Sequence, residues 1–248
     1  VEWQKSDRPR LETLEKFALL GDESNQRTQA QEILTTFDRT TTPEAAFDIL
    51  VDLGVWEVHE NLALRRSQIP TDFSEAVLAM AQHRLNHPPP DPDANRLDLT
   101  ALKTYTVDDE STREIDDALS METLEDGRQR LWVHIADPTR WVLPGDDLDL
   151  EARRRCTTVY LPTGIVPMFP LELATGPMSL VQGEIRCALS FGIVLTEEGA
   201  IADYWITTSL VKPTYRLTYE DVDEMLDLGI QAEPELLAIA RWAKVREQ

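Results

Sequence analysis

The strongest constraint on the fold is a change of hydrophobic period across the proline-rich stretch 87–93, which reads His-Pro-Pro-Pro-Asp-Pro-Asp. Before this stretch, apolar residues recur at helical spacing, and after it short strand-like runs alternate with turn signals. Consecutive prolines cannot continue a helix, and they favour an extended, semi-rigid spacer. The sequence therefore predicts a helical domain over residues 1–86, a linker over 87–98 and an α+β domain over 99–248.

The helical domain is expected to resemble a winged helix-turn-helix. Thr42-Pro43-Glu44 is a strong helix start, with a hydroxyl cap, a proline in the first turn and an acid near the positive end of the helix dipole. Residues 55–59 and 62–65 are expected to form a short hairpin. Three helices followed by a hairpin is the order of a winged helix-turn-helix. The expected helices cover residues 11–20, about 23–37, 42–53 and about 72–85.

The charge balance limits the possible functions. The chain has 248 residues and a formal net charge of −21, which counts against a simple nucleic-acid binder because phosphate contacts need Lys and Arg. An enzyme that binds phosphate through a metal at an acidic site remains compatible with this charge. Two basic clusters stand out. Arg65-Arg66 is a candidate nucleic-acid contact of the first domain. The second cluster is Arg153-Arg154-Arg155, in which Arg153 and Arg154 are candidate nucleic-acid contacts. The alternative for both clusters is solvation at a helix end.

The cysteines and the hydropathy indicate a cytoplasmic protein. Cys156 and Cys187 are far apart and form no CxxC pair, so two reduced thiols are the simpler interpretation, although a disulfide remains open. No apolar run approaches the length of a membrane span, and no membrane partner is expected. The four histidines show no metal spacing with the cysteines.

The segment 108–117, Asp-Asp-Glu-Ser-Thr-Arg-Glu-Ile-Asp-Asp, is the clearest candidate site. It crowds Asp108, Glu114, Asp116 and Asp117 between two strand-like runs. Like charges this close need a compensating cation or solvent, and hard oxygen donors with room for water suit Mg²⁺ or Mn²⁺. One alternative is a solvated acidic turn. A structural Ca²⁺ site is a third possibility, but the segment lacks the glycine and the alternating spacing of an EF-hand.

The remainder of the second domain predicts a sheet with few helices. Residues 104–107 run as a strand into the acidic segment, and a hairpin is expected to turn at Asp126-Gly127. Four prolines between residues 162 and 177 suggest a fixed loop that lines a site. The expected strands are 104–107, 118–124, 130–136, 188–195 and 202–207, with a charged helix over 147–155.

Three segments resemble the ribonuclease II family, whose members are hydrolytic 3′→5′ exoribonucleases with an RNB catalytic domain. They are residues 106–119, residues 133–138 (Val-His-Ile-Ala-Asp-Pro) and residues 159–170, which begin Val-Tyr-Leu-Pro. Their order and spacing make a chance match very improbable. The match extends over about residues 99–219, which resembles the first part of an RNB domain.

The resemblance implies a metal site and an RNA-binding residue. Asp108, Asp116 and Asp117 match three of the four acidic metal positions of the family, and Glu114 stands where most members have Asp. Tyr160 matches a tyrosine that stacks on a terminal base. The implied function is a 3′→5′ exoribonuclease that releases nucleoside 5′-monophosphates from single-stranded RNA, with Mg²⁺ or Mn²⁺ as cofactor.

The departures from the family pattern are also informative. The helical first domain does not resemble the small RNA-binding β-barrels that commonly precede RNB. The later part of RNB, with an arginine that stabilises the scissile phosphate, and an S1-type domain are missing from this sequence, so the chain is expected to be an exonuclease fragment that is inactive alone. The competing hypothesis is an RNA-binding or regulatory winged-helix protein on a catalytically degenerate RNB platform.

Overall fold

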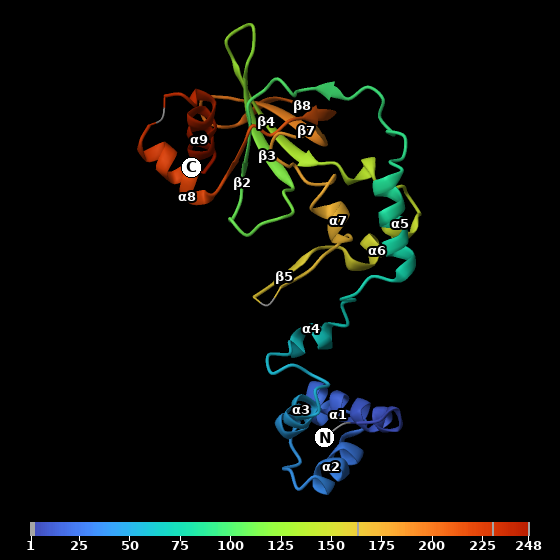
Figure 1. Ribbon diagram of the computed structural model, residues 1–248. Coiled ribbons are helices and arrows are strands. Elements are labelled where there is room, and N and C mark those ends of the chain that lie inside the picture. Colours follow the sequence, from blue (N-terminus) through green and yellow to red (C-terminus); the bar gives the residue numbers. More distant parts are fainter. Residues whose placement is uncertain (1–2, 163, 230, 248) are drawn as a thin grey trace. The chain divides into compact units, whose positions relative to one another are not determined.

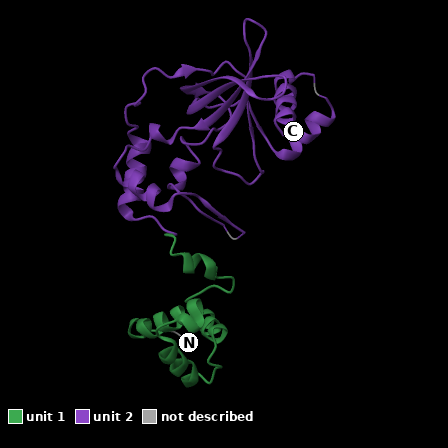
Figure 2. Cartoon of the chain, turned by 180° about the vertical axis from the view of Figure 1, so that it is seen from behind, with its two compact units in different colours: residues 1–70 green, residues 71–248 purple. Residues whose placement is uncertain are grey.

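A computed structural model describes residues 3–162, 164–229 and 231–247. The chain forms two compact units, unit 1 (Val1–Pro70) and unit 2 (Thr71–Gln248), which are coloured separately in Figure 2. Unit 1 is helical and unit 2 combines a sheet with helices, so the α+β fold class is confirmed. Within the described ranges, no helix is both long and apolar enough to cross a membrane.

Unit 1 is built around three helices that share one apolar core. Leu14, Phe17, Leu34, Leu50 and Trp56 are almost fully buried in it. The third helix begins as the sequence predicted, because the Thr42 side chain caps it by accepting a hydrogen bond from the Ala45 amide. The elements are η1 (Lys5–Asp7), α1 (Arg8–Leu20), η2 (Gly21–Glu23), α2 (Arg27–Thr36), α3 (Pro43–Asp52) and α4 (Leu62–Ser67).

The expected hairpin of unit 1 is wrong. Residues 55–59 form turns, and Leu62–Ser67 is the helix α4, so unit 1 shows no strand or wing in its described part. The Asn61 side chain accepts a hydrogen bond from the Leu64 amide and caps a helix at this point. Trp56 is buried in the core formed by the helices of unit 1 and does not form part of a strand.

Unit 2 contains a seven-stranded sheet of order β1-β8-β7-β4-β3-β2-β9 (Figure 1). The central strands are antiparallel, and the two edge strands β1 and β9 pair in parallel with β8 and β2. The strands are β1 (Leu97–Asp98), β2 (Thr104–Val107), β3 (Asp117–Thr123), β4 (Gln129–Ala136), β7 (Arg186–Leu195), β8 (Ile201–Val211) and β9 (Tyr215–Leu217), and a separate hairpin contains β5 (Val159–Leu161) and β6 (Gly164–Val166).

Helices cover unit 2 in two groups, which Figure 1 shows on opposite sides of the sheet. One group packs through Val77, Ala81, Leu148 and Leu173, and the other places Leu236 and its neighbours against β2 and β3. The first group contains α5 (Glu75–Asn86), η3 (Pro138–Arg140), α6 (Asp147–Arg155) and α7 (Leu171–Ala174), and the second contains α8 (Tyr219–Asp227) and α9 (Pro234–Glu247).

The expected domain boundary at residue 87 differs from the division between the compact units, which falls after Pro70. Helix α5 had been assigned to the first domain. It belongs to unit 2 because Val77 and Ala81 bury their side chains against α6 and α7. The proline run that follows α5 therefore lies inside unit 2.

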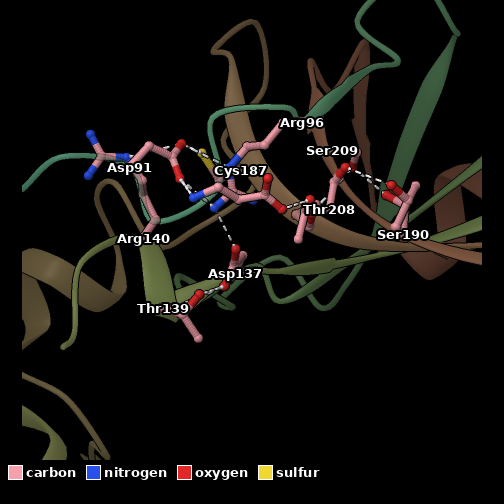
Figure 3. Close-up of polar contacts among 12 residues, drawn as sticks. Asp91, Arg96, Asp137, Thr139, Arg140, Cys187, Ser190, Thr208 and Ser209 are labelled. Atoms are coloured by element: carbon pink, nitrogen blue, oxygen red, sulfur yellow. Dashed lines mark hydrogen bonds and ion pairs between the residues drawn. The ribbon is translucent and has the colours of Figure 1, made fainter. Parts of the chain in front are cut away.

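The segment expected to be a spacer is fastened to the sheet by ionic contacts, as Figure 3 shows. Arg96 is almost fully buried and pairs with Asp91 at 2.9 Å and with Asp137 at 2.8 Å. Arg140 donates a hydrogen bond to the Pro89 carbonyl. Cys187 lies in the same cluster as a free thiol, and burial raises its pKa. Residues 87–98 are thus part of the second folded unit and do not act as a free linker.

A row of buried polar side chains crosses five strands of the sheet. Thr104, Ser120, His134, Ser190 and Ser209 are each fully buried. Their side chains are linked in this order by contacts of 2.8, 2.9, 2.7 and 2.5 Å. The imidazole in the middle of the row is neutral in the folded state, because burial lowers its pKa to about 4.

Candidate functional site

The acidic segment 108–117 connects β2 to β3 and is anchored at both ends by backbone bonds. The Asp108 amide donates to the Leu217 carbonyl at 3.1 Å, and the Asp116 carbonyl accepts from the Ala136 amide at 2.7 Å. Between these points, the Ile115 amide donates to the buried Ser179 hydroxyl at 2.8 Å. The carboxylates are therefore held at the end of the sheet by three different elements.

The electrostatics of the segment show that its carboxylates lie close enough to interact. Burial is the main reason why the pKa of Asp108 is raised, and the negative charges of Asp117 and Asp116 raise it further. The pKa of Asp116 is raised by the same two causes, burial and then the charge of Asp117. Asp116 is open to solvent on one side, yet the protein around it removes part of its hydration. Burial also raises the pKa of Glu114, with a further increase from Asp116.

Glu114 is held by one hydrogen bond and leaves its other oxygen without a partner. Its Oε2 accepts from the Thr158 hydroxyl at 3.1 Å. Its Oε1 is buried and has no hydrogen-bond partner among the described residues. A buried carboxylate oxygen without a donor is costly, so a bound cation would satisfy it well. The sequence analysis did not identify Thr158.

The donor set fits a hard divalent cation in chemistry. All four candidates supply carboxylate oxygens, and over the described ranges none of them forms an ion pair with Lys, Arg or His. The same part of the chain contains no group of three or more His, Cys, Asp or Glu side chains that is already arranged to hold a metal. Metal binding by Asp108, Glu114, Asp116 and Asp117 therefore stays a prediction.

Arg216 is a second residue that the sequence analysis missed. It lies on β9, and its guanidinium donates to the Thr112 carbonyl at 2.6 Å and to the Glu110 carbonyl at 3.3 Å. Its positive charge lowers the pKa of Asp108, against the other effects on that group. Arg216 thus fastens the tip of the acidic segment and offsets part of its charge. It follows Thr106 by more than one hundred residues, so local patterns gave no signal for it.

Tyr160 is close to the acidic segment and open to solvent. It lies on β5 and its side chain is among the most exposed of the large hydrophobic residues, at 63%. Partial burial raises the pKa of its phenol, and Glu114, Asp116 and Asp108 raise it further, which shows that the ring is within reach of their charges. An exposed ring beside the candidate site is compatible with base stacking, which stays a prediction.

The predicted arginine contacts lie on exposed helix ends. Arg153 pairs with Asp149 at 3.1 Å and Arg154 pairs with Glu151 at 3.1 Å, both within the charged helix α6. Both side chains are mostly exposed, and contact with RNA stays a prediction for them. Arg155 differs, because it is buried and donates to the Pro167 and Asp72 carbonyls.

In unit 1, the two candidate arginines also make contacts within their own unit. Arg65 pairs with Glu60 at 2.7 Å and lies over the Trp56 ring. Arg66 donates from Nε to the Leu19 carbonyl. A role in nucleic-acid contact stays a prediction for both.

Comparisons with known proteins agree with this fold. The RNB domain model matches residues 96–247, and the model of a double HTH domain matches residues 1–62. An uncharacterized ribonuclease of Synechocystis sp. is 58% identical over all of this chain and 37% of its own length. A chloroplastic/mitochondrial ribonuclease II of Arabidopsis thaliana is 41% identical over 99% of this chain and 31% of its own length. This chain therefore spans about a third of the length of these relatives.

A solved structure shows the same fold at low identity. Mycoplasma genitalium RNase R, in complex with ribose methylated single-stranded RNA, has a TM-score of 0.64 and 24% identity over 75% of this chain and 29% of its own. The two family matches define an RNB domain preceded by a helical double helix-turn-helix domain. The chain belongs to the ribonuclease II family.

Proposed function

We propose that the protein containing this chain is a hydrolytic 3′→5′ exoribonuclease that releases nucleoside 5′-monophosphates from single-stranded RNA. Family membership supports ribonuclease activity, and the relatives named above are ribonucleases. The observation that carries the finer proposal is the acidic segment. Burial raises the pKa values of Asp108, Glu114 and Asp116, these carboxylates form no ion pairs in the described ranges, and they lie beside an exposed tyrosine. Such a group of unneutralised carboxylates is typical of a metal-dependent site.

We also propose Mg²⁺, or Mn²⁺ in its place, as the cofactor of this site. Asp108, Glu114, Asp116 and Asp117 would hold it. When bound, it would supply the positive charge that makes water nucleophilic at neutral pH and stabilises the charge on the phosphate. The buried, unpartnered Oε1 of Glu114 and the hard oxygen character of all four side chains support this proposal.

The protein's own residues would orient the substrate. In the reaction a water oxygen adds to the terminal phosphorus, the bond to the preceding O3′ breaks, and that oxygen takes up a proton. A carboxylate oxygen of Asp116 would accept a hydrogen bond from the attacking water and so orient it. Tyr160 would stack on the terminal base, which tolerates any sequence because every base has a π-face. Arg153 and Arg154 would contact phosphates further along the strand.

The decisive assay uses the longest native polypeptide that contains this chain, with RNA labelled separately at each end. In Mg²⁺, the 3′-label should appear at once in a nucleoside 5′-monophosphate. RNA that carries the 5′-label should become progressively shorter from its 3′ end. Excess chelator should stop both, and added Mg²⁺ should restore them. The isolated chain of 248 residues should degrade RNA negligibly. Activity that is indifferent to chelation would refute the metal proposal.

The same assay separates the competing hypothesis. An RNA-binding protein on a degenerate RNB platform would retain labelled RNA on a filter without shortening it at any metal concentration. Nucleic-acid contact by unit 1 remains part of our proposal, and binding of RNA by a variant with Arg65→Ala and Arg66→Ala would test it. A cytoplasmic location is also proposed, supported by the free thiols of Cys156 and Cys187, and cell fractionation would test it.

A further inference from the structure

Thr158 connects the acidic segment to the hairpin that contains Tyr160. Its hydroxyl donates to Oε2 of Glu114 at 3.1 Å, and Oγ1 of Thr158 accepts from the Met168 amide at 3.0 Å. Thr158 lies immediately before β5, and Met168 lies just after β6, so both bonds meet at the base of the β5–β6 hairpin. One hydroxyl therefore joins three segments that are separate in sequence.

The bond makes the two oxygens of Glu114 different. Oε2 is occupied by the hydroxyl of Thr158, whereas Oε1 is buried and has no partner among the described residues. A glutamate has more rotamers to lose than an aspartate, so an unheld Glu114 would reach the site in many orientations. A hydrogen bond to the charged group reduces that freedom and is stronger than one between neutral groups.

We infer that Thr158 is a positioning residue that adapts this site to a glutamate at position 114. It holds Oε2 so that Oε1 faces the ligand, and it fixes the hairpin with Tyr160 relative to the same carboxylate. An aspartate at position 114 would be shorter by about 1.5 Å, one carbon–carbon bond, and could not keep the contact of 3.1 Å with Thr158 without backbone movement. The inference rests on the proposed function for its meaning in catalysis, but the coupling itself is measurable by metal binding alone.

The first test compares three variants in the longest native polypeptide. Thr158→Val keeps the shape and removes the hydroxyl, and Thr158→Ser keeps the hydroxyl. Thr157→Val is the matched control, because Thr157 is exposed and its hydroxyl donates only to the neighbouring Thr158 carbonyl. Loss of a hydrogen bond to a charged group predicts that Thr158→Val weakens Mn²⁺ binding and lowers kcat by roughly tenfold. All values for Thr158→Ser and Thr157→Val should change by less than about twofold.

The second test is a double-mutant cycle with Glu114→Asp, measured by Mn²⁺ titration. Because the shorter side chain has already lost the contact, adding Thr158→Val to Glu114→Asp should change Mn²⁺ affinity by less than about twofold. Equal, additive effects of Thr158→Val in both backgrounds would overturn the inference. The thermal midpoint of each variant shows whether the substitution destabilises the protein as a whole. If Thr158→Val does so, the Mn²⁺ affinity of Thr158→Ser and the double-mutant cycle still decide whether Thr158 positions Glu114.

The outcomes separate this inference from the proposed function. A wild-type protein that binds Mn²⁺ but does not shorten RNA would refute the exoribonuclease and leave the coupling between Thr158 and Glu114 to be judged by the cycle. A wild-type protein that shortens RNA, with additive effects in the cycle, would keep the exoribonuclease and refute the positioning role. Absence of Mn²⁺ binding by the wild type would overturn the positioning role outright.

Discussion

His134 should make the stability of unit 2 depend on pH in the mildly acidic range. Its ring is fully buried between the Ser120 and Ser190 hydroxyls and stacks on Trp132. Burial lowers its pKa from 6.5 to about 4. Below pH 6.5 the imidazole binds a proton in the unfolded chain but not in the folded one. The contribution of His134 to the free energy of unfolding is therefore fully present above pH 6.5 and is lost as the pH falls toward 4.

The size of the effect follows from the two pKa values. Between about pH 7.5 and about pH 5 the free energy of unfolding should fall by about 2 kcal/mol because of this one group. The test compares urea unfolding of the wild type and of His134→Asn across this range. Asparagine does not titrate, so the difference in stability between the two proteins should shrink by about 2 kcal/mol on acidification. Carboxylates with shifted pKa values are common to both proteins and cancel in the difference.

Two measurements guard this prediction. His87→Asn is the matched control, because His87 is exposed in the same unit and the substitution is identical. It should not reproduce the change caused by His134→Asn. The imidazole of His134 should also titrate near 4 in an NMR experiment on the folded protein. An NMR midpoint close to 6.5, or equal pH dependence in the wild type and His134→Asn, would refute the reasoning.

Three further predictions concern the proposed active site and its support. Asp116→Asn should lower RNA turnover by roughly 10²-fold or more while RNA affinity stays the same or rises. The control Asp109→Asn removes one charge from the same segment and should have little effect on turnover. If Asp116→Asn loses both RNA binding and folding, Asp116 is a structural residue. Tyr160→Ala should weaken RNA binding by about tenfold or more in a filter assay, whereas Tyr160→Phe should bind like the wild type; equal loss in both variants would argue for the hydroxyl over the ring. Arg155→Met should destabilise unit 2 by about 3 kcal/mol in urea unfolding, because it leaves buried acceptors unpaired, and an unchanged midpoint would contradict this.

Local signals in the sequence predicted β2, β3, β4, β7, β8 and α6 of unit 2, but they missed β1, β5, β6, β9 and the short helix α7. The charged helix over residues 147–155 is confirmed with the same bounds, because Asp146 caps its start and the arginines favour its carboxyl end. The hairpin that turns at Gly127 is also confirmed, with Gly127 at a positive φ of 82°. These features depend on contacts between residues that are close in sequence.

The errors and omissions lie where distant contacts decide the outcome. The hairpin expected over residues 55–65 gave way to α4 because Trp56 joined the helical core of unit 1. Helix α5 was assigned to the wrong unit, since only its packing on α6 and α7 shows where it belongs. Thr158 and Arg216 contact the acidic segment from positions 44 and 104 residues further along the chain, so no spacing pattern could identify them.

The parallel pairing of β9 with β2 has a consequence for synthesis of the chain. The acidic segment emerges from the ribosome about 100 residues before Leu217, whose carbonyl holds the Asp108 amide, and at 5–20 residues per second this is an interval of roughly 5–20 s. Ribosome-bound chains that end before Tyr215 should therefore be cut by protease within residues 108–117, and longer chains should be protected. Equal protection in both would refute this order of assembly.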